Sequence, residues 1–192
     1  TWTTLINQST NQLFNNLTAT TWYRALVQSG VCAQLYSDTT IITVRQAVTP
    51  ANAGADQTIC LPTSYQLNAN SPTEGTGSWS QISGPTTLTF SNLTDPKAII
   101  SGLVPGAYSL TWTISNGICA DSKDTVTIIF DSLTVAGNTN SDTTVCATSN
   151  SGVITLSNNV GSVVRWEMST DNGTTWTTLI NQSTNQLFNN LT

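Results

Sequence analysis

Four cysteines are the residues of this chain with the clearest chemistry: Cys32, Cys60, Cys119 and Cys146. The chain has no histidine, and no two cysteines form a close Cys-x-x-Cys pair of the kind that binds zinc. Disulfide bonds are therefore the chemistry that the cysteines indicate. A bridge between Cys60 and Cys119 would close a long loop, worth roughly 4 kcal/mol in the chain-entropy model.

Carboxylates are the other candidate ligands. Asp121 lies close to Asp124 in the sequence, and Asp131 and Asp142 flank a junction between segments. Calcium needs about six to eight oxygen ligands that converge on one point, and no loop repeats such a set. The sequence therefore predicts no cofactor and leaves calcium as an open alternative. Without histidine, a nucleophile motif or a cofactor-binding loop, the chain is not expected to be an enzyme.

A short motif, Ser169-x-Asp171-x-Gly173-x-x-Trp176, fits the Asp-box pattern known from sialidase propellers. In that pattern the Asp accepts hydrogen bonds from turn amides, the Gly adopts positive φ and the Trp packs beneath the turn. The motif predicts a structural hairpin rather than a sugar site.

Composition excludes some classes of partner. Only 8% of the residues are charged, the formal net charge is −5 and the pI is about 4.2. Nucleic acid requires a basic surface, so it is not an expected partner. No apolar run approaches the roughly 18 residues of a membrane span, so none is expected in this segment.

The organisation of the chain follows from a perfect internal repeat. Residues 175–192 are identical to residues 1–18, which defines a period of 174 residues. Within one period two modules resemble each other. Asp56-Gln-Thr-Ile-Cys60 matches Asp142-Thr-Thr-Val-Cys146, and Ser115-Asn-Gly-Ile-Cys-Ala120 matches Gln28-Ser-Gly-Val-Cys-Ala33.

These matches predict three segments. Residues 50–131 form a complete module, residues 1–49 the C-terminal half of a second module, and residues 132–192 the N-terminal half of its next copy. The matched cysteines then predict a Cys60–Cys119 disulfide, whereas Cys32 and Cys146 pair with cysteines of adjacent repeats. Both copies of the 18-residue stretch are expected to form a strand and hairpin.

Alternating side chains predict an all-β fold of sandwich modules. The residues expected on one buried face are Tyr108, Leu110, Trp112 and Ile114, followed in the next strand by Val126, Ile128 and Phe130. The same alternation places Trp22 opposite Tyr23, Ala25 and Val27, so Trp22 is a candidate exposed aromatic residue.

Gly77-Ser-Trp-Ser80, Gly106-Ala-Tyr108 and Trp112-Thr-Ile-Ser-Asn-Gly117 resemble PKD-like and Ig-like modules of Bacteroidetes surface proteins. A second set of residues resembles the companion Ig-like repeats of such proteins: Thr21-Trp-Tyr-Arg24 and Trp166-Glu-Met-Ser-Thr-Asp-Asn-Gly-Thr-Thr-Trp176, which includes the Asp-box motif. Long arrays of this kind look like the giant adhesins of gliding flavobacteria. The resemblance implies Ig-like/PKD-like modules stacked as an extracellular rod at the outer membrane. Four triplets resemble the O-glycosylation signal of Bacteroidetes, with acceptors Thr39, Thr125, Ser132 and Thr143.

The expected function is a structural stalk repeat of a secreted cell-surface adhesin for attachment and gliding motility. Its expected partners are neighbouring repeats of the same polypeptide, with surface polysaccharide or the substratum beyond them. The alternative is a glycan- or surface-binding module that acts by avidity. Exposed coplanar aromatic residues would favour the alternative.

Overall fold

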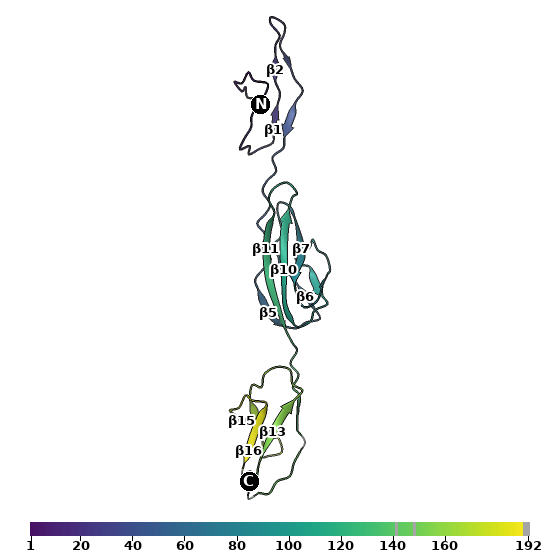
Figure 1. Cartoon of the computed structure of the whole chain (residues 1–192), viewed down its shortest axis with the longest axis vertical. Coiled ribbons are helices and arrows are strands. Elements are labelled where there is room, and N and C mark those ends of the chain that lie inside the picture. The colour runs from purple at the N-terminus through teal and green to yellow at the C-terminus, as the bar shows by residue number, and fades with distance from the viewer. Residues whose placement is uncertain (141, 148, 190–192) are drawn as a thin grey trace.

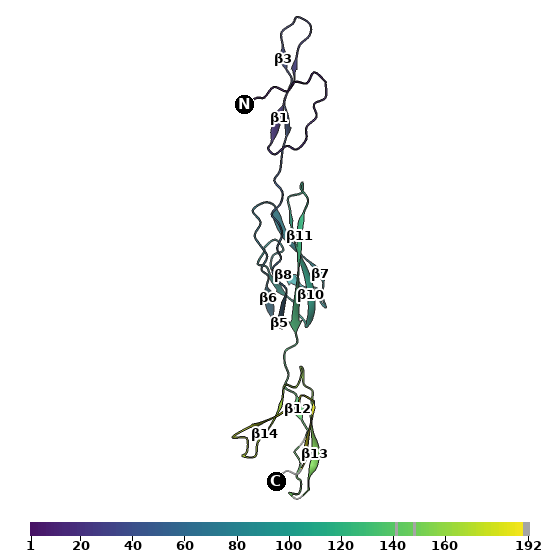
Figure 2. The ribbon, with the colours of Figure 1, turned by 90° about the vertical axis from the view of Figure 1, so that its left-hand side faces the viewer.

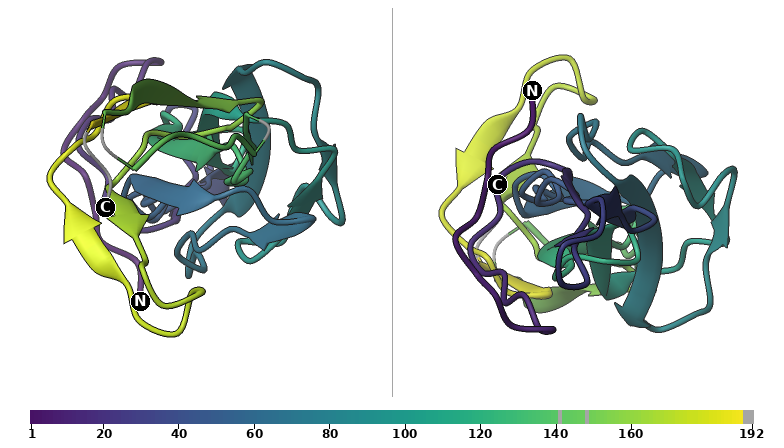
Figure 3. Two further views of the ribbon diagram at one scale, coloured as in Figure 1. Left: turned by 90° about the horizontal axis from the view of Figure 1, so that it is seen from below. Right: turned by 90° about the horizontal axis from the view of Figure 1, so that it is seen from above.

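The computed structural model describes residues 1–140, 142–147 and 149–189. The described residues form strands and no helix, as the sequence predicts. Three segments follow one another along a single long axis, and two views at right angles show the same succession (Figures 1 and 2). Seen along that axis, they overlie one another (Figure 3). We name them the upstream segment (residues 1–42), the central segment (50–131) and the downstream segment (135–189). The upstream link (43–49) joins the first two.

The central segment is a sandwich of two sheets. One sheet has the strand order β5-β11-β10-β7 and the other has the order β6-β9-β8. The bounds are β5 Gln57–Cys60, β6 Ser64–Gln66, β7 Thr76–Ser83, β8 Thr89–Phe90, β9 Ile99–Ser101, β10 Gly106–Ser115 and β11 Ser122–Asp131.

The inner faces of these sheets form the core. All the buried hydrophobic residues of the described chain lie between Val48 and Phe130. Every residue of β10 and β11 predicted on the buried face is at most 3% exposed. Trp79 and Trp112 pack at 5.1 Å between ring centroids, and Phe130 contacts both Tyr65 and Tyr108 edge to face. Strand alternation therefore produces the expected buried layer.

A tyrosine joins this core to the surface loops. The hydroxyl of Tyr108 accepts a hydrogen bond from the Val104 amide at 3.1 Å and lies 2.8 Å from the Thr86 hydroxyl. Its ring is fully buried. Such a bond back to the main chain resembles the tyrosine corner of immunoglobulin-like sandwiches.

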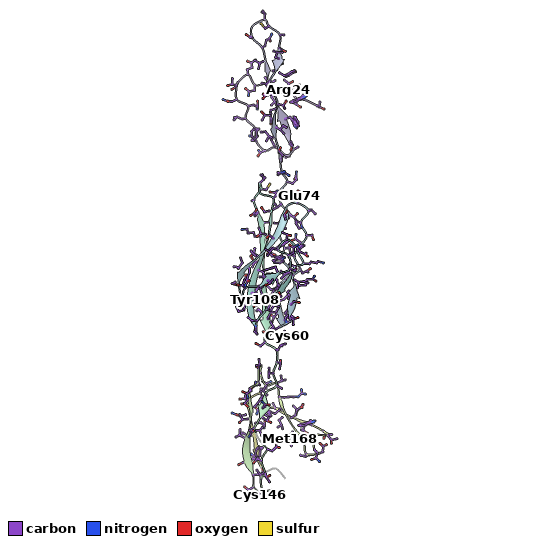
Figure 4. The ribbon with its side chains drawn as sticks, turned by 90° about the vertical axis from the view of Figure 1, so that its right-hand side faces the viewer. Arg24, Cys60, Glu74, Tyr108, Cys146 and Met168 are labelled. Atoms are coloured by element: carbon purple, nitrogen blue, oxygen red, sulfur yellow. The ribbon has the colours of Figure 1, made fainter. Side chains whose placement is uncertain are left out.

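The first and last strands of the central segment run in the same direction. β5 pairs with β11 in parallel, with Cys60 opposite Asp131, whereas β11–β10 and β10–β7 are antiparallel. The last strand therefore ends beside the end of the first strand. Figure 4 shows the result, because Glu74 lies at the end nearest the upstream segment and Cys60 at the end nearest the downstream segment.

The upstream and downstream segments contain small, separate sheets. In the upstream segment β1 pairs with β4 and β2 with β3; in the downstream segment the orders are β12-β13-β16 and β14-β15. The bounds are β1 Thr21–Tyr23, β2 Leu26–Val27, β3 Leu35–Tyr36, β4 Thr40–Ile42, β12 Asn138–Thr139, β13 Ser151–Ser157, β14 Trp166–Met168, β15 Thr177–Leu179 and β16 Asn185–Asn189.

Neither flanking segment buries a hydrophobic side chain among its described residues. Tyr23 is half-buried, and Ala25 and Val27, which the alternation places on an inner face with it, are exposed. Large apolar side chains such as Ile6 and Ile180 are fully exposed. Each segment therefore presents an apolar face without the sheet that would cover it.

The duplicated 18-residue stretch adopts two structures. Its central turn is the same in both copies: the side-chain amide of Asn7 donates to the Asn11 carbonyl at 2.9 Å, and that of Asn181 donates to the Asn185 carbonyl at 2.8 Å. Strands form only in the second copy, where β16 pairs with β13. The prediction of strand and hairpin is therefore wrong for residues 1–18. In the second copy, residues 190–192 lie outside the described residues.

The physical reason is that a turn is local, whereas a strand requires a partner. In the second copy, β13 comes earlier in the chain and pairs with β16. The first copy starts at Thr1, so the described chain gives it no preceding copy of β13 to pair with. The exposed side chains of Leu13 and Phe14 follow from the same cause.

We therefore predict that adding a copy of residues 132–174 before Thr1 converts residues 11–15 into a strand. Hydrogen exchange should show those amides exchanging fast in the 192-residue chain and as slowly as residues 185–189 in the lengthened chain. Residues 106–115 serve as the internal control, since they are paired in both chains. Fast exchange of residues 11–15 in the lengthened chain would contradict the explanation.

Candidate functional site

All four cysteines are free thiols in the structure. Cys60 ends β5 opposite Asp131, the last residue of β11, whereas Cys119 precedes Ser122, the first residue of β11. A ten-residue strand spans about 33 Å, but a disulfide needs Cα atoms within about 7 Å. The predicted Cys60–Cys119 bridge is therefore wrong. The two thiols mark opposite ends of the central segment.

Cys119 lies against the upstream link. Its sulfur is 3.3 Å from the Gln46 carbonyl oxygen and 3.8 Å from that of Arg45. The side chain of Asn116 holds the same contact: its amide donates to the Gln46 carbonyl at 2.9 Å, and its oxygen accepts from the Cys119 amide at 2.9 Å. The turn between β10 and β11 thus binds the chain that enters from the upstream segment.

Further contacts fix the rest of this link. The Thr49 hydroxyl accepts from the amides of Thr73 and Glu74, each at 2.9 Å, and the Thr49 amide donates to the Glu74 carbonyl at 3.0 Å. Val48 packs into the core. The sequence did not predict this docking. The visible signal in the sequence is that apolar residues, among them Val48, occur within this short join.

The Asp-box motif forms the predicted hairpin between β14 and β15. The Asp171 carboxylate accepts from the Thr175 amide at 2.9 Å, from the Thr175 hydroxyl, and from the Ser169 hydroxyl at 2.7 Å. Asn172 and Gly173 adopt positive φ values of 58° and 80°. The Trp176 indole donates to the Gly173 carbonyl at 3.1 Å. The polar side chains of Ser169, Asp171 and Trp176 are thus all used inside the turn.

Those hydrogen bonds stabilise the charged carboxylate. The side-chain bond from Thr175 contributes most, followed by the Thr175 amide and Ser169, and together they lower the pKa of Asp171 from 3.8 to about 2. The group is solvent-exposed, so the effect is local to the turn. This perturbed carboxyl group has a structural explanation and needs no catalytic role.

The other acidic residues do not gather into a cluster. Within the described residues, no three His, Cys, Asp or Glu side chains lie close enough to hold a metal ion together. Asp124 accepts from the Ala53 amide at 2.7 Å, and Asp56 accepts from the Thr127 amide at 2.7 Å. These two carboxylates therefore act as ties between the start of the central segment and β11.

The candidate glycosylation acceptors are all exposed: Thr39, Thr125, Ser132 and Thr143. Thr125 differs from the others because its hydroxyl lies 2.8 Å from that of Thr111 across the sheet. A glycan on Thr125 would have to break that contact.

Five of the six tryptophans lie either in the core or at the surface, and Trp166 is half-buried. Trp79 and Trp112 are buried, whereas Trp22 is 55% exposed and Trp2 and Trp176 are similarly exposed. Near Trp2, the Arg24 guanidinium lies 4.1 Å from its ring centroid and 3.8 Å from that of Tyr36. Such stacking is a cation–π contact, which the sequence analysis missed. All three exposed tryptophans belong to the flanking segments.

Two protein families match the chain. Residues 53–130 match the PKD domain described as K319L-like, and residues 1–46 and 135–192 match a single domain of unknown function, DUF8696. The DUF8696 match covers more than half of the chain. The chain belongs to the DUF8696 family. Its central segment is a PKD-like, Ig-type domain inserted between the two stretches of DUF8696 sequence.

A solved structure gives a further likeness. The solution structure of the PKD domain from KIAA 1837 protein is 24% identical, covers 47% of this chain and 92% of its own, and superposes with a TM-score of 0.39. No curated protein matches the chain. The described residues contain no helix long and apolar enough to cross a membrane.

The Asp171 hydrogen bonds predict an acid-sensitive hairpin in this DUF8696 segment. Because the folded pKa lies below 3.8, the ionised carboxylate stabilises the hairpin above pH 3.8, and the contribution is lost as the pH falls to about 2. NMR titration should show the Asp171 carboxyl group titrating near pH 2. Asp171→Asn should loosen residues 169–176 at neutral pH, whereas Asp38→Asn, outside the hairpin, should not. An ordinary titration of Asp171 near pH 4 would contradict the geometry.

Proposed function

We propose that this chain is a segment of the stalk of a large, secreted cell-surface adhesin. In this proposal the DUF8696 and PKD-like modules alternate along a rod and act mechanically rather than chemically. The finer proposal is a Bacteroidetes adhesin of outer-membrane-associated type, resembling the gliding-motility adhesin SprB. Its rod would carry load between the cell surface and a substratum or polysaccharide.

The parallel pairing of β5 with β11 is the observation that carries the proposal. The chain enters the central segment near Glu74 and leaves it beside Cys60, at the opposite end (Figure 4). A module with that geometry passes the chain straight through. Modules that follow one another can then extend in line, as the three segments do in Figure 1.

The docked upstream link supports a stiff joint. Gln46, Val48 and Thr49 are each held by the central segment, so the link is not a free tether. A freely jointed chain would shorten by coiling, whereas a bound link transmits direction from one module to the next. Stiff joints suit a stalk that must hold its tip away from the cell.

The internal period of 174 residues supports repetition of the unit. Residues 1–46 and 135–192 match one family, and each of these stretches leaves apolar side chains uncovered. Both facts are explained if a DUF8696 module consists of residues 135–192 followed by the next copy of residues 19–46. The two incomplete halves would then cover each other in a continuing array.

A second candidate function, glycan binding by avidity, is favoured by one observation. Trp22 corresponds to Ser109 in the matched central module, a position on the outer face of the sheet opposite buried Leu110. Ser109 itself is half-buried, so completion of the module would keep Trp22 on the outer face and outside the core, where its ring could stack on a sugar. The same reasoning does not extend to Trp2 and Trp176, because they are exposed in flanking segments that are each only half of a module.

The stalk proposal predicts that length grows linearly with the number of repeats. Strands of ten residues and links of a few residues give about 4 nm per module, and so about 8 nm for each 174-residue period. Electron microscopy and small-angle scattering of chains with one, two and three periods, kept reduced, should show that increment. A maximum dimension that rises more slowly than repeat number would contradict the rod.

A further inference from the structure

The position of each cysteine along the module axis has a consequence for the joints between modules. The central segment carries Cys60 at its downstream end and Cys119 at its upstream end, so each thiol faces a neighbouring module. Figure 4 places Cys146 in the same way, at the end of the downstream segment farthest from the central one. If modules repeat in line, every junction contains one cysteine from each side.

The upstream junction shows how close those cysteines come. Cys119 contacts the carbonyl groups of Arg45 and Gln46, where the chain leaves the preceding module. The central segment serves as a template that shows which residue would lie beside Arg45 in a completed DUF8696 module. There Asp131, the last residue of β11, lies opposite Cys60.

The internal match transfers that pairing to the DUF8696 module. Asp124-TVTIIF-Phe130 aligns with Asp38-TTIITV-Val44, so Arg45 takes the place of Asp131. The separate match of Asp56-Gln-Thr-Ile-Cys60 with Asp142-Thr-Thr-Val-Cys146 aligns Cys60 with Cys146. A completed module would therefore place Cys146 of the preceding repeat beside Arg45. Neighbouring strands are about 4.8 Å apart, so Cys146 would lie one strand spacing from Arg45, whose carbonyl group Cys119 contacts.

The next junction repeats the arrangement with the other two cysteines. Cys60 lies beside Asp131 at the exit from the central segment. Cys32 takes the place of Cys119 at the entry of the following module. Both cysteines close a turn with the residue three positions earlier. The Cys32 amide donates to the Ser29 carbonyl at 3.0 Å, and the Cys119 amide donates to the Asn116 side chain at 2.9 Å. Cys32 of the next repeat would therefore approach Cys60.

We propose that the cysteines form disulfides across the junctions, Cys60 with Cys32 of the next repeat and Cys146 with Cys119 of the next repeat. This inference rests on the proposed repeating stalk. Each bridge forms by thiol–disulfide exchange with an external disulfide donor. The two thiols lose two protons and two electrons as their S–S bond forms, and the donor disulfide is reduced to two thiols.

The bridges would change how the stalk carries load. Tension that enters at Cys119 passes along β11 to Asp131, the residue from which the chain leaves the module. Residues 50–118 then lie outside the loaded path and cannot be drawn out. The loaded path through the module is then residues 119–131, which β11 already holds extended, rather than the whole chain. This stiffens the stalk without any change in the sandwich core.

The experiment uses a chain lengthened by one further 174-residue period, oxidised with a glutathione redox pair, alkylated and digested without reduction. The proposal predicts two linked peptide pairs, Cys60–Cys32 and Cys119–Cys146, and four free thiols at the two ends. Bridges within modules would instead link Cys60 to Cys119 and Cys32 to Cys146 and leave two free thiols. That outcome, or eight free thiols, would overturn the proposal.

Two controls separate this test from the stalk itself. The 192-residue chain lacks all four partner cysteines, so its four thiols should stay free under the same oxidation. In the longer chain, Cys119→Ser in both copies should abolish only the Cys119–Cys146 peptide. The length of the reduced chain tests the stalk independently, since a rod without bridges keeps its linear increment and loses only the linked peptides.

Discussion

Parallel pairing between β5 and β11 determines the direction in which the chain passes through the central segment. In a module whose first and last strands are antiparallel neighbours, the two termini lie at the same end. Here the last residue of β5 lies opposite the last residue of β11, so entry and exit fall at opposite ends. The in-line arrangement of the three segments, the docked upstream link and the separation of the cysteines all depend on this one pairing.

Among the described residues, only those of the central segment and its upstream link form a buried hydrophobic core. Its two sheets close around Trp79, Trp112 and Phe130, and Asp124 and Asp56 tie the entering chain to β11. The flanking segments have small sheets with one face uncovered. Identical residues near Leu13 and Leu187 accordingly differ in structure, because only the second copy has β13 beside it. A strand is a property of a pair, whereas the Asn7 and Asn181 turns are properties of their own sequence.

The sequence was sufficient for features that depend on local chemistry or on alternation. The buried faces of β10 and β11 follow from period-two patterning, and the Asp171 hairpin follows from a motif whose hydrogen bonds are internal. The direction of pairing could not be predicted, since alternation is the same for parallel and antiparallel neighbours. That is why matched cysteine spacing suggested a bridge within the module, although Cys60 and Cys119 lie a full strand length apart. The docking of Gln46 and Thr49 was also missed, because polar link residues carry no periodic signal.

The distance between Cys60 and Cys119 tests the parallel arrangement most directly. Cys32→Ser and Cys146→Ser leave these two thiols for nitroxide spin labels in the 192-residue chain, and pulsed electron paramagnetic resonance then measures their separation. The account predicts a single distance of about 3 nm, the length of β11. A separation below about 1 nm would place both cysteines at one end of the module and contradict the parallel pairing of β5 with β11, together with the in-line passage of the chain.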